Sequence, residues 1–305
     1  MAELNSHKKL IVIVGPTAVG KTSLSIELAN HFNCPILSFD SRQFYSEISI
    51  GTAKPTPEEL ASARHYFISS RSIEEEYTAG MFETDAIEQL NKIYQEHEYC
   101  IAVGGSGLYI NALCYGIDNI PSDKKLRDEL EEEWKSKGLE VLQEELKSID
   151  PEYYAQADIQ NPRRVMRAIE VFRLSGKPFS HYRKSTAKKR PFEIELIGLK
   201  QDSEILYERI NKRVDQMLKE GLLDEVKSVY HLKHLKALRT VGYQEIFSYL
   251  DGEYELDKAV ELVKRNSRRY ARKQISWFKR DSNIRWFEPD EKEEIFSYLK
   301  SIKWF

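Results

Sequence analysis

The 305-residue sequence contains little cysteine and no long apolar run. Its three cysteines, Cys34, Cys100 and Cys114, lie far apart in apolar surroundings, which argues against a disulfide framework or a zinc site and for a reducing compartment. No stretch approaches the roughly 20 apolar residues of a membrane-spanning helix. The polar residues 1–9 precede an apolar run too short for a signal peptide. From these absences we expect a cytoplasmic protein without membrane contact.

The sequence also has almost no excess charge. Its formal net charge is −3, so any binding of nucleic acid must depend on clusters of basic residues. Hydrophobic residues make up 41% of the chain, enough for a substantial core. The length allows one large domain or two smaller ones.

Residues 15–22 have the spacing G-x-x-x-x-G-K-[ST] of a phosphate-binding loop. The loop follows an apolar run at residues 10–14 and precedes a helical pattern at residues 23–32, which is the strand–loop–helix context of this motif. Glycines let backbone N–H groups turn inward, and the helix adds its positive N-terminal end. Lys21 supplies a full charge, and the Thr22 hydroxyl can hold Mg²⁺. The motif predicts a pyrophosphate site formed by Gly15, Pro16, Thr17, Ala18, Val19, Gly20, Lys21, Thr22 and Ser23.

Further buried strands are predicted at residues 35–39, 99–103 and 193–199, with helical segments between them, and a short strand is predicted at residues 65–69. A second glycine-rich turn follows the strand at 99–103. This alternation predicts an α/β fold, a parallel sheet flanked by helices. Asp40 comes directly after the second strand, where ligands of such sheets bind, although a helix cap or a surface turn explains an aspartate there equally well.

Residues 121–190 show helical periodicity and no strong strand, and they change from acidic to basic along the segment. We predict an all-helical insertion domain at 121–190 within a core domain of residues 1–120 and 191–305. Arg163 and Arg167 share a helix face there. They could form a solvated surface or contact a nucleic-acid backbone.

Two other helices carry notable arginines. Arg209 and Arg213 lie beside the apolar stripe of a helix at residues 203–219, where they could clamp a pyrophosphate or simply flank the stripe. Residues 262–280 contain eight cations and no acid, interleaved with Tyr270, Trp277 and Phe278. A basic helix with aromatic groups favours RNA binding over a plain solvated face.

Six segments follow one another in a recognisable order: residues 15–22, 40–43 (DSRQ), 51–55 (GTAKP), 104–109 (GGSGLY), 163–171 and 241–243. Together they resemble the bacterial tRNA dimethylallyltransferases, and the resemblance covers residues 10–290. Two departures are small: Ser106 stands where threonine is more common, and the sequence has no C-terminal zinc finger of the eukaryotic type.

The resemblance implies transfer of a dimethylallyl group from dimethylallyl diphosphate to N6 of the adenosine 3′ to the anticodon, in tRNAs that read codons beginning with U. Asp40 is the expected general base, while Lys21, Arg213 and Mg²⁺ held by Thr22 would stabilise the leaving pyrophosphate. Arg209 and Arg213 are expected to contact the diphosphate, and the protein is expected to be a monomer. The expected tRNA-contacting residues are Asp40, Ser41, Arg42, Gln43, Ser106, Arg127, Arg163, Arg164, Val165, Met166, Arg167, Arg239, Thr240, Val241, Gly242, Tyr243, Gln244, Arg268 and Arg272.

Two other enzyme classes fit parts of the pattern. A small-molecule or nucleotide kinase would use the same loop with an arginine lid, but would leave the basic helix without a role. An isopentenyltransferase acting on free adenine nucleotides would share the core motifs. A non-enzymatic, GTPase-like RNA-binding protein would be expected to carry an N-K-x-D motif, which is absent.

Overall fold

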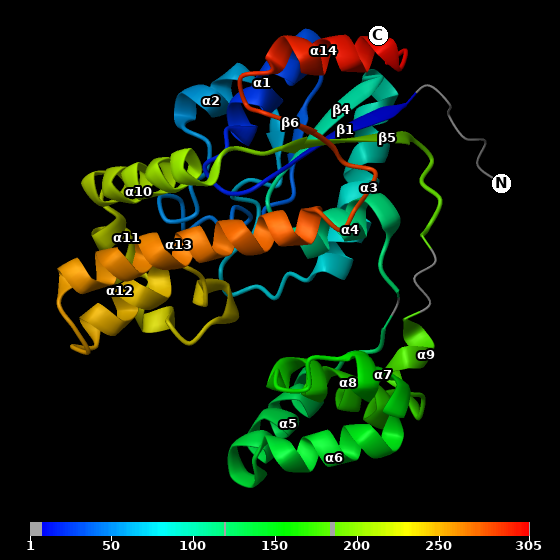
Figure 1. Ribbon diagram of the computed structural model, residues 1–305, viewed down its shortest axis with the longest axis vertical. Coiled ribbons are helices and arrows are strands. Elements are labelled where there is room, and N and C mark those ends of the chain that lie inside the picture. The colour runs from blue at the N-terminus through cyan, green and yellow to red at the C-terminus, as the bar shows by residue number, and fades with distance from the viewer. Residues whose placement is uncertain (1–7, 119, 184–186, 305) are drawn as a thin grey trace. The chain divides into compact units, whose positions relative to one another are not determined.

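The computed structural model describes residues 8–118, 120–183 and 187–304, and within these ranges six parallel strands form one sheet. The strand order is β3-β2-β4-β1-β5-β6 (Figure 1). Each parallel pair requires a crossover connection, which the intervening helices supply. This confirms the predicted α/β class. The strands are β1 (Lys9–Val14), β2 (Ile36–Ser38), β3 (His65–Tyr66), β4 (Tyr99–Val103), β5 (Glu193–Leu199) and β6 (Arg285–Phe287).

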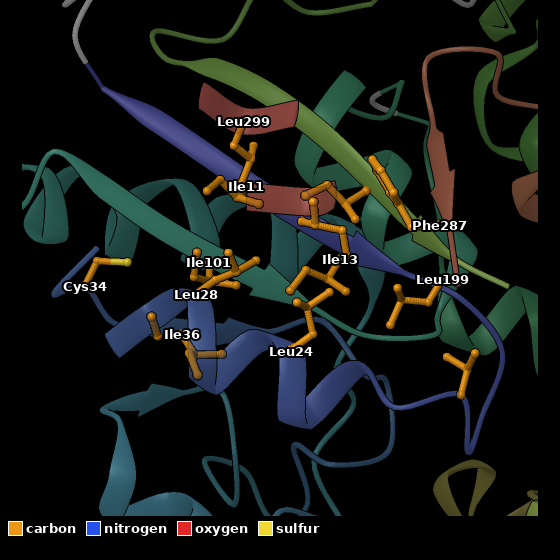
Figure 2. Close-up of a cluster of buried hydrophobic side chains, with 14 of the residues drawn as sticks. Ile11, Ile13, Leu24, Leu28, Cys34, Ile36, Ile101, Leu199, Phe287 and Leu299 are labelled. Atoms are coloured by element: carbon orange, nitrogen blue, oxygen red, sulfur yellow. The ribbon is translucent and has the colours of Figure 1, made fainter. Parts of the chain in front are cut away.

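The centre of the sheet is fully buried. Ile11 and Ile13 of β1 and Ile101 of β4 pack in one apolar cluster with Leu28 of α1 (Lys21–His31) and Leu299 of α14 (Lys292–Ser301), as Figure 2 shows. These five side chains are all 0% exposed. Burying a side chain of this size contributes about 1.5–3 kcal/mol, so the cluster fixes the strand that leads into the phosphate-binding loop.

Several predicted elements have different bounds in the structure, among them β2, which spans Ile36–Ser38 and not residues 35–39. Helix α1 begins at Lys21, two residues before the predicted start, so Lys21 and Thr22 lie in its first turn. Strand β3 ends at Tyr66 and does not reach residue 69, because Phe67 has a φ of 63°, which a strand cannot accommodate.

Helices α10 (Ser203–Lys219) and α13 (Leu256–Phe278) lie side by side (Figure 1). Lys264 of α13 pairs with Asp215 of α10 at 2.5 Å, and Leu206, Ile210 and Val214 form the buried stripe of α10 as predicted. The remaining helices of this unit are α2 (Pro57–Ser62), α3 (Ala79–Glu96), α4 (Gly107–Tyr115), α11 (Leu222–Ser228) and α12 (Tyr243–Leu250), with 3₁₀ turns η1 (Tyr230–Leu232) and η2 (Lys236–Leu238). No helix in the described ranges is long and apolar enough to cross a membrane.

The chain divides into two compact units, Met1–Cys114 with Lys189–Phe305, and Tyr115–Lys188. The second unit begins at Tyr115, before the predicted start of the insertion at 121, and ends at Lys188, close to the predicted end at 190. Its core contains Leu130, Leu146 and Ile169. Buried Asp150 accepts hydrogen bonds from the backbone N–H groups of Tyr153 (3.0 Å) and Ser180 (2.8 Å). The unit comprises α5 (Lys124–Lys137), α6 (Leu139–Ile149), α7 (Pro151–Gln156), α8 (Pro162–Ser175) and α9 (Phe179–Tyr182).

Candidate active site

A cavity of about 820 Å³ opens where several strands of the first unit end. Thr17 follows β1, Asp40 follows β2, and Gly104 follows β4, and all three residues line it. Ligands of open parallel sheets bind at this edge, because the loops after neighbouring strands converge there. The sequence patterns therefore predicted the correct edge of the sheet.

The phosphate-binding loop has the curled form that its glycines allow. Gly15 and Gly20 have φ values of 148° and 110°. A Cβ on Gly15 would lie 2.6 Å from the backbone oxygen of Leu199, so glycine is required there. The Lys21 ammonium donates to the Gly15 oxygen (3.0 Å) and the Pro16 oxygen (2.7 Å), which closes the loop around the lysine side chain.

Not every residue of the loop faces the cavity. Gly15, Pro16 and Val19 are buried, and Val19 packs in the apolar cluster of the sheet. Their side chains shape the loop, and any contact they make with a ligand would come from their backbone; the prediction that they belong to the diphosphate site stays a prediction. The residues of the loop that line the cavity are Thr17, Ala18, Gly20, Lys21, Thr22 and Ser23.

Three charged side chains interact inside the cavity. Burial lowers the pKa of Lys21 to about 8; the charge of Asp40 raises this pKa, and the nearby charge of Arg213 lowers it. Burial also lowers the pKa of Arg213, and Asp40 again opposes the shift. Two cations thus share one partly dehydrated space with one carboxylate, an arrangement that favours a further anion. Arg209, on the next turn of α10, also lines the cavity but is exposed, so Arg213 is the more enclosed of the two arginines.

Asp40 is held by a tight local turn. Its Oδ1 accepts from the Arg42 backbone N–H at 3.0 Å, and its own N–H donates to the Ser38 hydroxyl at 3.3 Å. The geometry is therefore compatible with both interpretations of Asp40, a residue that stabilises a surface turn and a residue with a chemical role. The Ser41 N–H donates to the Ser106 hydroxyl at 3.0 Å, which ties this turn to the second glycine loop.

Gln43 lines the cavity, but hydrogen bonds within the protein already engage its amide. Its Nε2 donates to the backbone oxygen of Ala53 at 2.9 Å, and its Oε1 accepts from Ser38 at 3.3 Å. Lys54, from the GTAKP segment, likewise donates to the hydroxyls of Ser69 (2.8 Å) and Ser49 (3.2 Å). Both side chains hold loops together in this structure.

The segment before α12 forms another wall of the cavity, lined by Arg239, Thr240, Val241, Gly242 and Gln244. Tyr243 is the exception. It is 0% exposed, and its hydroxyl donates to Glu225 Oε1 at 2.6 Å. The prediction that Tyr243 touches tRNA is wrong for its side chain, because aromatic packing outweighs its place in the motif.

Sequence reasoning missed Gln274, a polar residue of α13 that is only 5% exposed. Its Oε1 accepts from the Thr17 N–H at 2.9 Å, and its Nε2 donates to the Gly105 oxygen at 2.9 Å. One amide therefore joins the phosphate-binding loop to the second glycine loop. The available signal was its helical spacing with buried Ala271 and Phe278, which places it on the inner face of α13.

The outer face of α13 keeps part of the predicted basic surface. Arg272 and Tyr270 are exposed, and Tyr270 also lines the cavity. Arg268 instead donates to Asn211 of α10 at 2.6 Å, and Phe278 is 2% exposed. Arg268 therefore braces two helices, and Phe278 belongs to the core and offers no surface for stacking.

In the helical unit, Arg163 and Arg164 are exposed and Met166 is half-buried, but Val165 is 0% exposed and cannot contact a partner. Arg167 donates to the Pro121 oxygen (2.9 Å) and to Glu170 (2.7 Å). Arg127 lies 3.5 Å from the same carboxylate, which is 0% exposed. Arg127 and Arg167 thus neutralise a buried charge, a structural role that the sequence pattern did not reveal.

The site as a whole combines an anion cradle with a carboxylate. Lys21, Arg213 and the loop amides can stabilise a phosphate-bearing leaving group. Asp40 shares their cavity and can accept a proton from a nucleophile. This pairing suits displacement of a diphosphate by a group that must lose a proton as it reacts.

Known proteins are similar to this chain in sequence and in fold. The IPP transferase family model matches residues 43–281. The tRNA dimethylallyltransferase 1 of Bacteroides fragilis is 50% identical over 298 residues, 97% of this chain and 99% of that protein. The tRNA dimethylallyltransferase of Cytophaga hutchinsonii is 47% identical over 296 residues, 97% of each chain.

Solved structures of related enzymes have a similar fold. The tRNA isopentenylpyrophosphate transferase of Bacillus halodurans matches with a TM-score of 0.71 and 37% identity over 96% of each chain. A eukaryotic dimethylallyltransferase acting on tRNA matches with a TM-score of 0.74 and 30% identity, over 89% of this chain and 70% of that one. The chain therefore belongs to the IPP transferase family.

Proposed function

We propose that this protein is a tRNA dimethylallyltransferase. It transfers the dimethylallyl group of dimethylallyl diphosphate to N6 of the adenosine 3′ to the anticodon, in tRNAs reading codons that begin with U. The observation that carries the proposal is the placement of Asp40 in the same cavity as Lys21, Thr22 and Arg213. The names of the relatives support tRNA as the acceptor and argue against the kinase alternative.

The exocyclic amine of adenine is a weak nucleophile, because its lone pair is delocalised into the ring. In the proposed reaction N6 attacks C1 of the dimethylallyl group as the bond from C1 to the diphosphate oxygen breaks. The N6 proton passes to Asp40, and the bonding electrons leave with the diphosphate. General-base help of this kind is worth about 10²–10⁴-fold in rate.

The diphosphate gains charge as it leaves, and the cations of the cavity oppose that charge. Lys21 and Arg213 are partly dehydrated there, so their interaction with an anion is stronger than it would be in water. Arg209 reaches the cavity from its exposed position and could close over the diphosphate.

A magnesium ion fits this cavity. Mg²⁺ needs few protein ligands, since water and phosphate oxygens complete its shell, and the Thr22 hydroxyl lines the wall beside Lys21. Thr22 would hold the ion, which when bound neutralises charge on the diphosphate.

The tRNA would contact the walls at residues 40–43 and 239–244, the exposed cations of α13, and Arg163 and Arg164 of the helical unit. An adenosine in a hairpin loop costs little to extrude, which suits a reaction inside a cavity. The protein would act as a monomer in the cytoplasm, since a single chain supplies Asp40, Lys21, Thr22 and Arg213 to the cavity.

A single transfer assay tests the proposal. The protein is incubated with Mg²⁺, labelled dimethylallyl diphosphate and one of three acceptors: unmodified tRNA, the same tRNA with the target adenosine replaced, and AMP. We expect label on the first acceptor alone. Label on AMP would instead support an enzyme acting on free nucleotides, and transfer of the ATP γ-phosphate without prenyl transfer would support a kinase.

A further inference from the structure

Glu225 of α11 makes an unusually complete set of hydrogen bonds. Its Oε2 accepts from the backbone N–H groups of Ser49 (2.7 Å) and Ile50 (2.8 Å), and its Oε1 from that of Gly51 (2.9 Å). The Tyr243 hydroxyl donates to the same Oε1 at 2.6 Å. One carboxylate thus binds three consecutive backbone donors and a buried phenol.

These contacts connect two walls of the cavity. Gly51 begins the wall at residues 51–55, and buried Tyr243 belongs to the segment 239–244, whose other residues line another wall. The Tyr243 ring packs so closely on Gly51 that a Cβ there would lie 2.6 Å from its Cε2 atom. A charged acceptor with several backbone donors is among the stronger hydrogen-bonded arrangements in proteins, so Glu225 fixes the position of the 49–51 turn.

A chain of hydrogen bonds continues from this turn to Asp40. The backbone oxygens of Thr52 and Ala53 accept from Gln43 Nε2 at 3.3 and 2.9 Å. The Ser38 hydroxyl donates to Gln43 Oε1 at 3.3 Å and accepts from the Asp40 N–H at 3.3 Å. Moving the 49–53 loop therefore moves the turn that carries Asp40.

We infer that Glu225 is a positioning residue that sets the place of Asp40 through the 49–53 loop and Gln43. The inference rests on the proposed role of Asp40 as the general base. Glu225 does not line the cavity, so it acts on the reaction only through the groups it holds: the 49–53 loop, which leads to Asp40, and Tyr243 of the 239–244 segment. A shift of about 1 Å in a catalytic group can cost about 100-fold in rate.

The test compares Glu225→Gln with Asp224→Asn. Both changes remove one carboxylate charge from the first turn of α11, but the Asp224 side chain is 83% exposed and pairs only with Lys227 at 3.3 Å among its described contacts. The amide of the glutamine has one oxygen that accepts and one NH₂ group that cannot, so the variant loses part of the hydrogen bonds that the carboxylate accepts from residues 49–51 and Tyr243. We measure kcat with tRNA and dimethylallyl diphosphate, the Kd of inorganic diphosphate, and the thermal midpoint.

For Glu225→Gln we expect kcat to fall about 10- to 100-fold, with the Kd of diphosphate within about twofold of the parent. The phosphate-binding loop shares no hydrogen bond with residues 49–53 in the described structure, which is why binding should survive. Asp224→Asn should match the parent in both quantities. Tyr243→Phe, which removes one bond of the set, should lower kcat about 3- to 10-fold with the same unchanged Kd.

A Glu225→Gln variant with the kcat of the parent would overturn the inference, and so would a loss of diphosphate binding equal to its loss of kcat. If Glu225→Gln does not fold, a Tyr243→Phe variant with parental kcat overturns it equally. An inactive parent would instead refute the proposed function, because the comparison of variants assumes prenyl transfer by the parent.

Discussion

Gln274 is the residue whose replacement tests the architecture of the site most directly. Its amide bonds to the Thr17 N–H and the Gly105 oxygen, both at 2.9 Å, from a position only 5% exposed. Methionine has similar length and packs well in helices, so Gln274→Met removes both bonds with little change of volume. Each backbone group left unpaired costs about 1–3 kcal/mol, which predicts a loss of about 2–6 kcal/mol in the free energy of unfolding.

A loss of this size is easily measured. One kcal/mol shifts the thermal midpoint by about 2–4 °C in a domain of 150–250 residues, so the midpoint should fall by at least about 4 °C. Because Thr17 belongs to the phosphate-binding loop, the affinity for inorganic diphosphate should fall as well. Differential scanning calorimetry and isothermal titration calorimetry with diphosphate measure the two effects separately.

Lys273→Met is the matched control, since Lys273 is exposed and adjacent on the same helix. It should leave the midpoint and the diphosphate affinity close to those of the parent. Gln274→Glu keeps an acceptor for the Thr17 N–H but places a carboxylate oxygen against the Gly105 oxygen, so it should also destabilise. If Gln274→Met unfolds within about 1 °C of the Lys273→Met control and binds diphosphate equally well, the two loops are not held by this amide.

Four other changes test separate parts of the molecule. Asp40→Ala should retain tRNA binding in a filter assay and lose at least about 100-fold in transfer rate, and near-parental turnover would refute its role as base. Since Lys21 has a folded pKa of about 8 and only its protonated form attracts an anion, diphosphate affinity measured by calorimetry should fall as the pH rises from 7 to 9, and Lys21→Met should abolish this fall. The double change Arg269→Ala plus Arg272→Ala, on the exposed face of α13, should weaken tRNA binding and lower the slope of log K against log salt by about 1.5 to 2; an unchanged slope would exclude this face from the interface. Glu170→Gln should destabilise the helical unit by about 1–3 kcal/mol in thermal unfolding, whereas an unchanged midpoint would show that this buried charge is not needed.

The sequence predicted the elements whose signals are local. Strands β4 and β5 and helix α10 have the predicted bounds, because a short apolar run between turn residues and an amphipathic stripe are complete within the element itself. The same holds for the phosphate-binding loop, since its glycines, lysine and threonine lie within eight positions. The place of Asp40 at the cavity was predictable, because the position after a strand predicts where a side chain lies in a parallel sheet.

Burial within a motif was not predictable in this way. Tyr243 and Val165 lie in segments that resemble tRNA contacts, yet both are 0% exposed. A motif marks the segment that approaches a partner, while helical periodicity decides which of its side chains point inward. Val165 occupies the inner face of α8 with Ala168 and Ile169. The helical periodicity therefore indicated that Val165 is buried, but the prediction followed the motif and assigned Val165 to the tRNA contact.

The polar residues that assemble the site give little local signal: helical spacing places Gln274 on the inner face of α13, but it does not tell which groups Gln274 meets. Gln274 contacts residues 169 and 257 positions away, and Glu225 contacts residues more than 170 positions away. A glutamine or glutamate on a helix has many possible roles, and only the fold determines which backbone groups it meets. Such groups are also costly to lose, because a buried donor or acceptor without a partner has no water to replace it.

The walls of the cavity come from loops distant in sequence, and each loop end contains backbone N–H and C=O groups that no strand can pair. Placing Gln274 and Glu225 against these groups satisfies them and fixes the spacing of the walls in one step. This argument predicts that replacements at these two residues disturb catalysis or ligand binding more than replacements at most residues that merely line the cavity.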